Sequence, residues 1–241
     1  NLISYLLIPF TIPVSLRNFL FNFSKKKQSS KVKTVCVGNI YLGGTGKTPL
    51  TIKIYEILKK LNYRVATVKK NYPEQQDEQQ LLNKKTNLII TKSRKNVIDK
   101  NSNKNLDYLI FDDGLQDMEI EFDIKLACFK SKYWIGNGQL IPAGPMRENI
   151  SSLKKFDGVF LNGHSNNLEK IENQIQNINS NIKIFRTFYK ILNIEKHNLN
   201  FKYLIFSGIG IPSDFKEILS KNKFKIVKEI IFPDHFKYDH H

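Results

Sequence analysis

The chain has 241 residues, of which 41% are hydrophobic and 25% charged, and this composition excludes disordered, fibrous and membrane-bundle proteins. Lys and Arg total 38 against 22 Asp and Glu, so the formal net charge is +16, which favours anionic partners such as phosphates, nucleic acid or an acidic lipid surface. A uniform enrichment in Lys, Asn and Ile explains the charge equally well. The two cysteines, Cys36 and Cys128, lie in apolar runs, so we expect reduced core residues in a cytoplasmic protein.

The first segment, residues 1–24, is largely apolar and aromatic. Pro9 and Pro13 interrupt it, and Arg17 and a basic cluster at 25–27 follow its apolar start. A spanning helix needs about 20 uninterrupted apolar residues, and a signal peptide places its positive charges before the apolar core. The alternative is a helix packed on the protein's own core. We favour an amphipathic helix at a membrane interface, with basic neighbours facing acidic headgroups.

Residues 25–195 alternate apolar runs with helical stretches. The pattern predicts a strand over 32–40, a helix over 49–63 and further strands over 63–70, 87–91, 106–113, 124–130, 156–163 and 182–190. Such alternation is typical of a mostly parallel sheet covered by helices on both faces, the α/β class. We place a boundary near the polar run 190–200. Residues 196–241, with a strand, a helix over 213–221 and another strand, then begin a smaller second α/β domain.

A glycine-rich loop, YLGGTGKTP at 41–49, connects the first strand to the first helix of the main domain. The strict phosphate-loop pattern requires Gly where this chain has Tyr41, but the physical requirements are met. Glycines aim backbone N–H groups at phosphate oxygens, and the helix N-terminus favours negative charge. Lys47 can reach terminal phosphates, and Thr48 can ligate Mg²⁺. The predicted nucleotide-binding residues are Tyr41, Leu42, Gly43, Gly44, Thr45, Gly46, Lys47 and Thr48.

Asp112 and Asp113 end the apolar run at 106–113, at the edge of the sheet where ligands bind in open α/β folds. Asp residues at that position commonly hold Mg²⁺ in phosphoryl-transfer enzymes, although a DDG sequence also suits a plain turn. We therefore predict Thr48, Asp112 and Asp113 as metal ligands. Asp77, considered without other information, reads as a solvated helix start, and His235 as a structural histidine.

Several stretches in the same order resemble the tetraacyldisaccharide 4′-kinases of lipid A synthesis. They are VGNIYLGGTGKTP (37–49), QDEQQLL (76–82), FDDGLQD (111–117), GNGQLIPAGPMRE (136–148), FSGIGIPSDF (206–215) and FPDH (232–235). The phosphate loop of that family also lacks the first glycine. The resemblance implies a phosphate-loop NTPase fold, with an apolar N-terminal helix on the membrane, a second domain and ATP and Mg²⁺ as cofactors.

The implied reaction is transfer of the γ-phosphate of ATP to the 4′-hydroxyl of an acylated glucosamine disaccharide 1-phosphate, giving lipid IVA. The resemblance also implies that the protein acts at the cytoplasmic face of the bacterial inner membrane. We expect a monomer that binds no nucleic acid. By motif, Asp77 matches the catalytic base and His235 its partner, while Asp113 joins them as a catalytic residue. Phosphoryl transfer needs such a proton acceptor for the attacking hydroxyl.

The chain departs from that family at four places, one of which is Gln76-Asp77-Glu78-Gln79 where the family has Gly-Asp-Glu-Pro. Asp117 stands where the family usually has a histidine, in DDGLQH. The stretch KKNYPEQQ (69–76) replaces the usual Ser-Arg-Gly-Tyr-Gly. The family also continues for several dozen residues beyond the Asp-His motif, so we interpret the sequence as stopping within its second domain.

Two other classes of protein share part of this pattern. Another phosphate-loop enzyme, a metal-insertion GTPase or a ligase-like ATPase, would share the glycine loop, but no Asn-Lys-x-Asp guanine motif occurs. A non-enzymatic nucleic-acid binder would use the +16 charge, but no recognisable nucleic-acid module occurs and the Asp112–Asp113 pair would repel phosphates without a metal.

Overall fold

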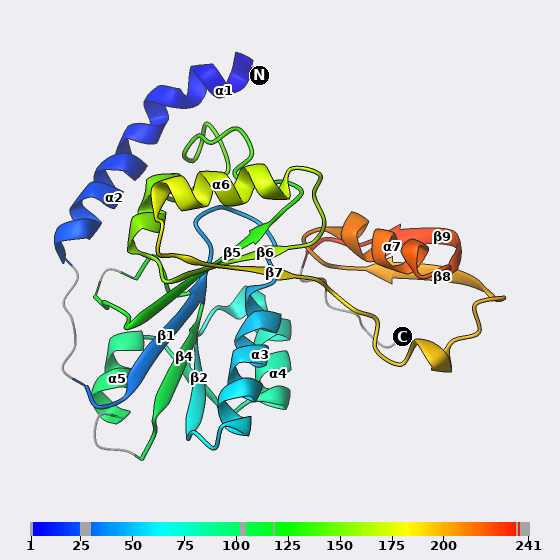
Figure 1. Ribbon diagram of the computed structural model, residues 1–241, viewed down its shortest axis with the longest axis horizontal. Coiled ribbons are helices and arrows are strands. Elements are labelled where there is room, and N and C mark those ends of the chain that lie inside the picture. Colours follow the sequence, from blue (N-terminus) through cyan, green and yellow to red (C-terminus); the bar gives the residue numbers. More distant parts are fainter. Residues whose placement is uncertain (1, 25–29, 102–104, 118, 235, 237–241) are drawn as a thin grey trace. The chain divides into compact units, whose positions relative to one another are not determined.

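The computed structural model describes residues 2–24, 30–101, 105–117, 119–234 and 236. The chain divides into two compact units, Asn1–Thr187 and Phe188–His241. The first unit is a parallel β-sheet covered by helices, and the second is a pair of parallel strands with a helix (Figure 1). The predicted α/β class is thereby confirmed.

The sheet of the first unit has seven strands in the described part of the chain, and neighbouring strands are all parallel. In spatial order they are β3 (Leu88–Thr91), β2 (Val65–Lys70), β4 (Tyr108–Asp112), β1 (Lys33–Gly38), β5 (Ile124–Lys130), β6 (Gly158–Asn162) and β7 (Lys183–Thr187). The central strands are nearly continuous apolar runs, because parallel strands are buried on both faces. Strands β2, β3 and β4 lie on one side of β1 and strands β5, β6 and β7 on the other, so the connections change direction beside β1, at the kind of switch point where ligands bind in such folds.

Helices cover both faces of this sheet. They are α3 (Lys47–Lys60), α4 (Gln76–Lys85), α5 (Arg94–Asn101) and α6 (Leu168–Ile178), with short 3-10 turns η2 (Pro73–Gln75) and η3 (Ile150–Lys155). The apolar stripe of α3, formed by Leu50, Ile54 and Leu58, packs against one set of buried strand residues. The other main cluster includes buried side chains of α5 and α6. The helix predicted over 49–63 begins two residues earlier, because Gly46 adopts a left-handed conformation and starts the helix at Lys47.

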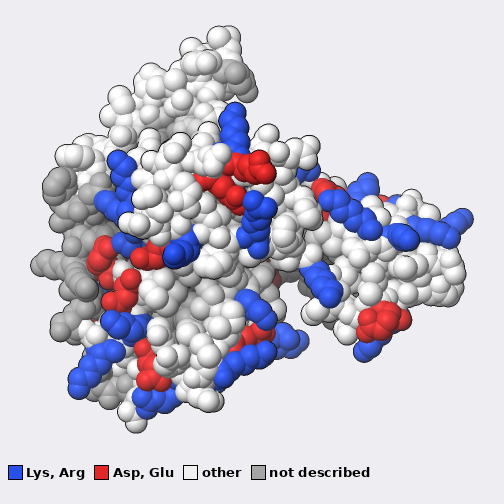
Figure 2. Space-filling model, viewed as in Figure 1, with Lys and Arg blue, Asp and Glu red and all other residues white. Residues whose placement is uncertain are grey.

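The N-terminal segment is helical, with α1 (Leu2–Leu7), η1 (Ile8–Thr11) and α2 (Ile12–Ser24). Its large apolar side chains are exposed: Leu6 to 67%, Phe10 to 65% and Phe19 to 60%. By length and composition alone, Leu2–Leu20 is apolar enough to cross a membrane, and none of that window is buried. In Figure 2 the segment at the top of the view, which is α1 in Figure 1, shows no charged side chain.

Among the described residues, three hydrogen bonds join this segment to the loop 136–148 of the same unit, and in one of them the amide of Asn137 donates to the hydroxyl of Ser4 at 2.8 Å. The hydroxyl of Ser4 donates to the carbonyl of Ala143 at 2.6 Å, and the amide of Asn18 donates to the carbonyl of Arg147 at 2.8 Å. The exposed apolar surface of the segment is therefore held next to the loop 136–148.

The second unit contains η4 (Ile194–Lys196), β8 (Lys202–Ser207), α7 (Pro212–Lys221) and β9 (Lys225–Ile231). The strands and the helix fall where the sequence predicted them. The structural division after Thr187 lies eight residues before the predicted start of the second domain at residue 196.

Candidate active site

The glycine-rich loop follows β1 and leads into α3 at the carboxyl edge of the sheet. Gly43 has a φ of 119° and Gly46 a φ of 87°, which are left-handed conformations that glycine adopts without a steric penalty. Gly46 directly precedes α3, so the N-terminus of that helix faces the loop. Asn39 steadies the loop by donating to the carbonyl of Gly43 at 3.3 Å and to the hydroxyl of Thr45 at 3.4 Å. This arrangement suits the cradling of an anion.

Tyr41, the residue that breaks the strict phosphate-loop pattern, is buried, with only 5% of its surface exposed. Its ring stacks on Phe129 with centroids 5.7 Å apart, and its hydroxyl accepts from the N–H of Lys130 at 3.0 Å. The aromatic side chain therefore anchors the start of the loop to β5. Leu42, by contrast, is 49% exposed. Of the predicted nucleotide-binding residues, Tyr41 is placed to contribute only its backbone.

Lys47 and Thr48 begin α3 and face the two adjacent carboxylates. The ammonium of Lys47 lies 3.6 Å from Asp113 Oδ2, and the Thr48 hydroxyl donates to Asp112 Oδ2 at 3.1 Å. Thr51, one turn further along α3, donates to the other oxygen, Asp112 Oδ1, at 3.1 Å. The structure thus brings the predicted loop residues and the predicted carboxylates into one cluster.

Asp112 and Asp113 differ sharply in environment. Asp112 is the last residue of β4 and is completely buried. Asp113 leaves the strand with a φ of 58°, a left-handed conformation that is uncommon outside glycine. Its N–H donates to the carbonyl of Val37 at 2.8 Å, and its side chain lies between Lys47 and Arg147. The strained backbone turns the second carboxylate out of the sheet and toward the phosphate loop.

Lys69 joins the same cluster, although the sequence did not single it out. The ammonium donates to Asp112 Oδ2 at 2.7 Å and also to Glu78 of α4. Burial alone would lower the pKa of Lys69, but the negative charges of Asp112 and Glu78 outweigh that effect, so the pKa is raised. Lys69 therefore stays a buried cation. The sequence of β2, which ends in Lys69 and Lys70, did not predict that Lys69 is buried.

Asp77 lies in the first turn of α4, with an exposed side chain, and its neighbour Glu78 reaches the cluster through Lys69. The predicted helix start at this position is thus present. His235 lies outside the described residues, so the predicted pairing of Asp77 with His235 stays a prediction.

The donor set fits Mg²⁺. The Thr48 hydroxyl and the carboxylates of Asp112 and Asp113 are hard oxygen ligands of the kind that this ion prefers. Within the described ranges, no group of three or more His, Cys, Asp or Glu side chains is arranged to hold a metal ion. Mg²⁺ is usually bound by one or two carboxylates, with substrate phosphates and water completing its shell. The residues present therefore suit an ion that arrives with a nucleotide.

The irregular loop 136–148 is attached to the phosphate loop by backbone bonds. The N–H of Leu42 donates to the carbonyl of Pro145 at 2.8 Å, and the N–H of Arg147 donates to the carbonyl of Ile40 at 2.7 Å. These bonds place the guanidinium of Arg147 3.5 Å from Asp113 Oδ1 and 3.3 Å from Gln116 Oε1. Arg147 is thereby part of the site.

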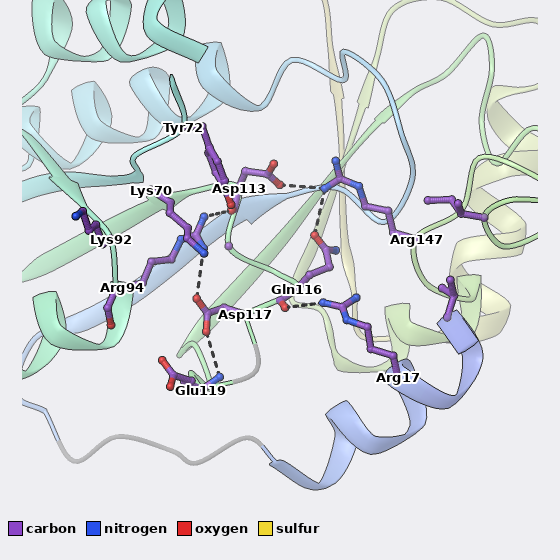
Figure 3. Close-up of a pocket in the computed structure, with 14 residues that line it drawn as sticks. Arg17, Lys70, Tyr72, Lys92, Arg94, Asp113, Gln116, Asp117, Glu119 and Arg147 are labelled. Atoms are coloured by element: carbon purple, nitrogen blue, oxygen red, sulfur yellow. Dashed lines mark hydrogen bonds and ion pairs between the residues drawn. The ribbon is translucent and has the colours of Figure 1, made fainter. Parts of the chain in front are cut away.

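A pocket of about 600 Å³ opens beside Asp113 (Figure 3). Its wall comes from α2, the ends of β2 and β3, the turn after β4 and the loop 136–148. The charged side chains that line it are Arg17, Lys70, Lys92, Arg94, Arg147, Asp113, Asp117 and Glu119. Cations outnumber carboxylates, so the pocket favours an anionic ligand next to the phosphate loop.

Arg94, at the start of α5, was also missed by the sequence analysis. It is 5% exposed and donates to the backbone carbonyl of Asp113 and to Asp117 Oδ2, the latter at 3.3 Å. The same guanidinium thus braces the strained residue and the following turn, as Figure 3 shows. Its Nε is buried with no hydrogen-bond partner among the described residues.

The chain matches the protein family described as tetraacyldisaccharide-1-P 4′-kinase over residues 2–241. A tetraacyldisaccharide 4′-kinase of Pelagibacter ubique (strain HTCC1062) is 47% identical over 98% of this chain and 74% of that protein. A protein of the same name from Wigglesworthia glossinidia brevipalpis is 31% identical over 89% of this chain and 63% of its own length. One from Rickettsia canadensis (strain McKiel) is 32% identical over 99% of this chain and 76% of its own length.

Among solved structures, LpxK from Aquifex aeolicus in complex with ATP is similar in fold, with a TM-score of 0.69. The two chains are 21% identical, and the similarity covers 97% of this chain and 83% of that one.

Proposed function

Since this chain belongs to the tetraacyldisaccharide-1-P 4′-kinase family, we propose that it transfers the γ-phosphate of ATP to the 4′-hydroxyl of an acylated glucosamine disaccharide 1-phosphate, giving lipid IVA. The membership makes the chain a kinase of lipid A biosynthesis that binds ATP. The single observation that carries the proposal is the family match over residues 2–241, which includes every element of the site.

The phosphate loop, residues 41–48, binds the triphosphate of ATP. Backbone N–H groups of the loop and the start of α3 meet phosphate oxygens, and Lys47 balances charge on the terminal phosphates. The support is the position of Lys47 at the mouth of the loop, 3.6 Å from Asp113. That carboxylate holds the ammonium in place before the nucleotide arrives.

Thr48, Asp112 and Asp113 would hold Mg²⁺. The ion supplies charge neutralisation of the phosphates when bound. The chain's own part is to orient its ligands: Thr51 and Lys69 donate to Asp112, while Lys47 and Arg147 flank Asp113. A ligand set fixed in this way needs little rearrangement on binding.

Asp77 accepts the proton of the attacking 4′-hydroxyl, and His235 assists it. The support is the motif match and the placement of Asp77 on α4, whose next residue is tied to the Asp112 cluster through Lys69. General-base catalysis by a positioned carboxylate contributes roughly 10²- to 10⁴-fold to rate.

The acceptor's anionic headgroup occupies the pocket of about 600 Å³ beside Asp113. The excess of cationic side chains there suits the 1-phosphate, and Arg147 lies where the acceptor and the transferred phosphate meet. Arg17 of α2 belongs to the same wall, so the apolar N-terminal helices lie next to the place where acyl chains would leave the pocket.

The protein works at the cytoplasmic face of the inner membrane, as a monomer attached by α1 and α2. The family acts on a lipid precursor, and the exposed apolar side chains of this segment suit burial in a bilayer interface. Basic residues that follow the segment in the sequence suit acidic headgroups.

The test is phosphate transfer from labelled ATP to tetraacyldisaccharide 1-phosphate in detergent micelles. Lys47→Ala serves as the blank, and an acceptor already phosphorylated at the 4′ position controls for the site of transfer. We expect Lys47-dependent label in the lipid and none in the blocked acceptor. ATP hydrolysis without lipid labelling would overturn the assigned acceptor.

A further inference from the structure

Lys69 is a charged side chain inside the sheet. It is the fifth residue of β2, its side chain is 2% exposed, and it lies directly opposite Asp112 in the parallel pairing of β2 with β4. Neighbours in register point to the same face of a sheet. The ammonium and the carboxylate therefore meet by the construction of the two strands.

A second carboxylate comes from a different element. Glu78 lies in the first turn of α4, immediately after Asp77, and it accepts from the same ammonium. Its side chain is 30% exposed, whereas that of Asp112 is fully buried. Lys69 thus connects the carboxylate at the end of β4 to the beginning of α4, two segments 34 positions apart in the sequence.

A buried ammonium is a poor way to gain stability. Removing the charge from water is costly even when partners are present, and apolar residues of similar size often replace buried ion pairs without loss. The presence of Lys69 at a buried position of β2 points to a task that a neutral side chain would not perform.

We propose that Lys69 is a positioning residue that fixes the first turn of α4, and with it Asp77, relative to Asp112. The inference rests on the proposed function, in which Asp77 is the base and Asp112 a metal ligand. The proposed base on α4 and the proposed metal ligand at the end of β4 are then held at a fixed distance from each other. A displacement of about 1 Å can cost roughly 100-fold in rate, so such a link bears on turnover.

Lys69→Met tests the proposal, because methionine has a similar length and no charge. Lys53→Met is the matched control, since Lys53 is 63% exposed on α3. For each variant we would measure kcat and KM for ATP, the affinity for a fluorescent ATP analogue in EDTA, and amide hydrogen exchange of residues 76–85.

The expected result for Lys69→Met is a fall in kcat of about tenfold or more, by loss of orientation. Binding of the analogue in EDTA should stay within about threefold of the parent, and exchange in α4 should speed up. Lys53→Met should change none of these. Unchanged kcat, or unchanged exchange in α4, would overturn the proposal, and so would equal losses of kcat and nucleotide affinity.

Glu78→Gln provides a second route should Lys69→Met fold poorly, because it weakens the link at its exposed end and leaves Lys69 with Asp112. It should reproduce the fall in kcat and the faster exchange. In the double variant the two effects on kcat should be less than additive, since both residues form one link. Fully additive effects on kcat would contradict the proposal that the two residues form one link. If the parent protein fails to label the lipid, the proposed function fails, while the exchange and EDTA-binding measurements still decide the role of Lys69.

Discussion

Arg94 forms an ion pair with Asp117, with 3.3 Å between Nη1 and Oδ2, and the same guanidinium donates to the carbonyl of Asp113. Asp117 thus gives the buried guanidinium of Arg94 an anionic partner. This ion pair closes the turn after β4 against the start of α5.

Asp117→Asn should lower the free energy of unfolding by about 1–3 kcal/mol, because the buried guanidinium loses its charged partner. Urea denaturation measures the change, and Asp99→Asn, on the exposed side of α5, is the control. A loss no larger than that of the control would show that the ion pair contributes nothing to stability.

Lys47→Ala should reduce kcat by at least about 100-fold, because the terminal phosphates lose a cation that acts in the transition state. Circular dichroism should be unchanged, since Lys47 is a partly exposed residue at the first position of α3. Steady-state labelling of the lipid provides the measurement. Turnover close to that of the parent would refute the assigned nucleotide site.

Asp77→Asn should slow the chemical step by roughly 10²- to 10⁴-fold, because asparagine accepts no proton at neutral pH. Single-turnover labelling separates this effect from nucleotide binding, which should change little. Gln76→Ala, one residue earlier in α4, is the control. A defect confined to ATP affinity would count against a proton-accepting role.

Replacing Leu6, Phe10 and Phe19 with serine should release the protein from anionic vesicles. All three are at least 60% exposed, so the fold should not suffer, while each loses about 1.5–3 kcal/mol of possible burial in lipid. Flotation on vesicles containing acidic phospholipid measures attachment. A triple variant that floats like the parent would place the attachment elsewhere in the chain.

Cys128 should resist alkylation in the folded protein. Burial raises the pKa of its thiol, so the reactive thiolate does not form at pH 8. Mass spectrometry after iodoacetamide treatment should show modification only with denaturant. In the unfolded chain the thiol ionises with a pKa near 9.0, so this group favours unfolding as the pH rises above about 9. Rapid labelling of native Cys128 would contradict its burial.

The sequence predicted the sheet, the phosphate loop and the place of Asp112 and Asp113, because each depends on a local pattern. Apolar runs of β1 and β4 reveal buried parallel strands, and strand ends in such a sheet share one edge. The break in the strict loop pattern at Tyr41 also has a simple reason in the structure, since its side chain belongs to the core.

The sequence did not predict the roles of Lys69 and Arg94, because these roles depend on contacts with distant residues and not on a local pattern. A lysine at the end of an apolar strand, followed by Lys70, looks like a solvated terminus, and an arginine at a helix start looks like a surface charge. Their roles arise from residues distant along the chain, Asp112 for Lys69 and Asp117 for Arg94. Only the pairing of β2 with β4 and the approach of α5 bring these groups together.

The backbone bonds between Leu42 and Pro145 and between Ile40, just before the phosphate loop, and Arg147 make the phosphate loop and the loop 136–148 a single structural module. A change in the backbone of either loop alters the position of the other, so we expect substitutions in the two loops to occur together in related proteins. A chimaera that takes only one loop from a relative should lose nucleotide affinity. Transplanting both loops together should restore it, which makes the pair the natural unit of exchange in engineering.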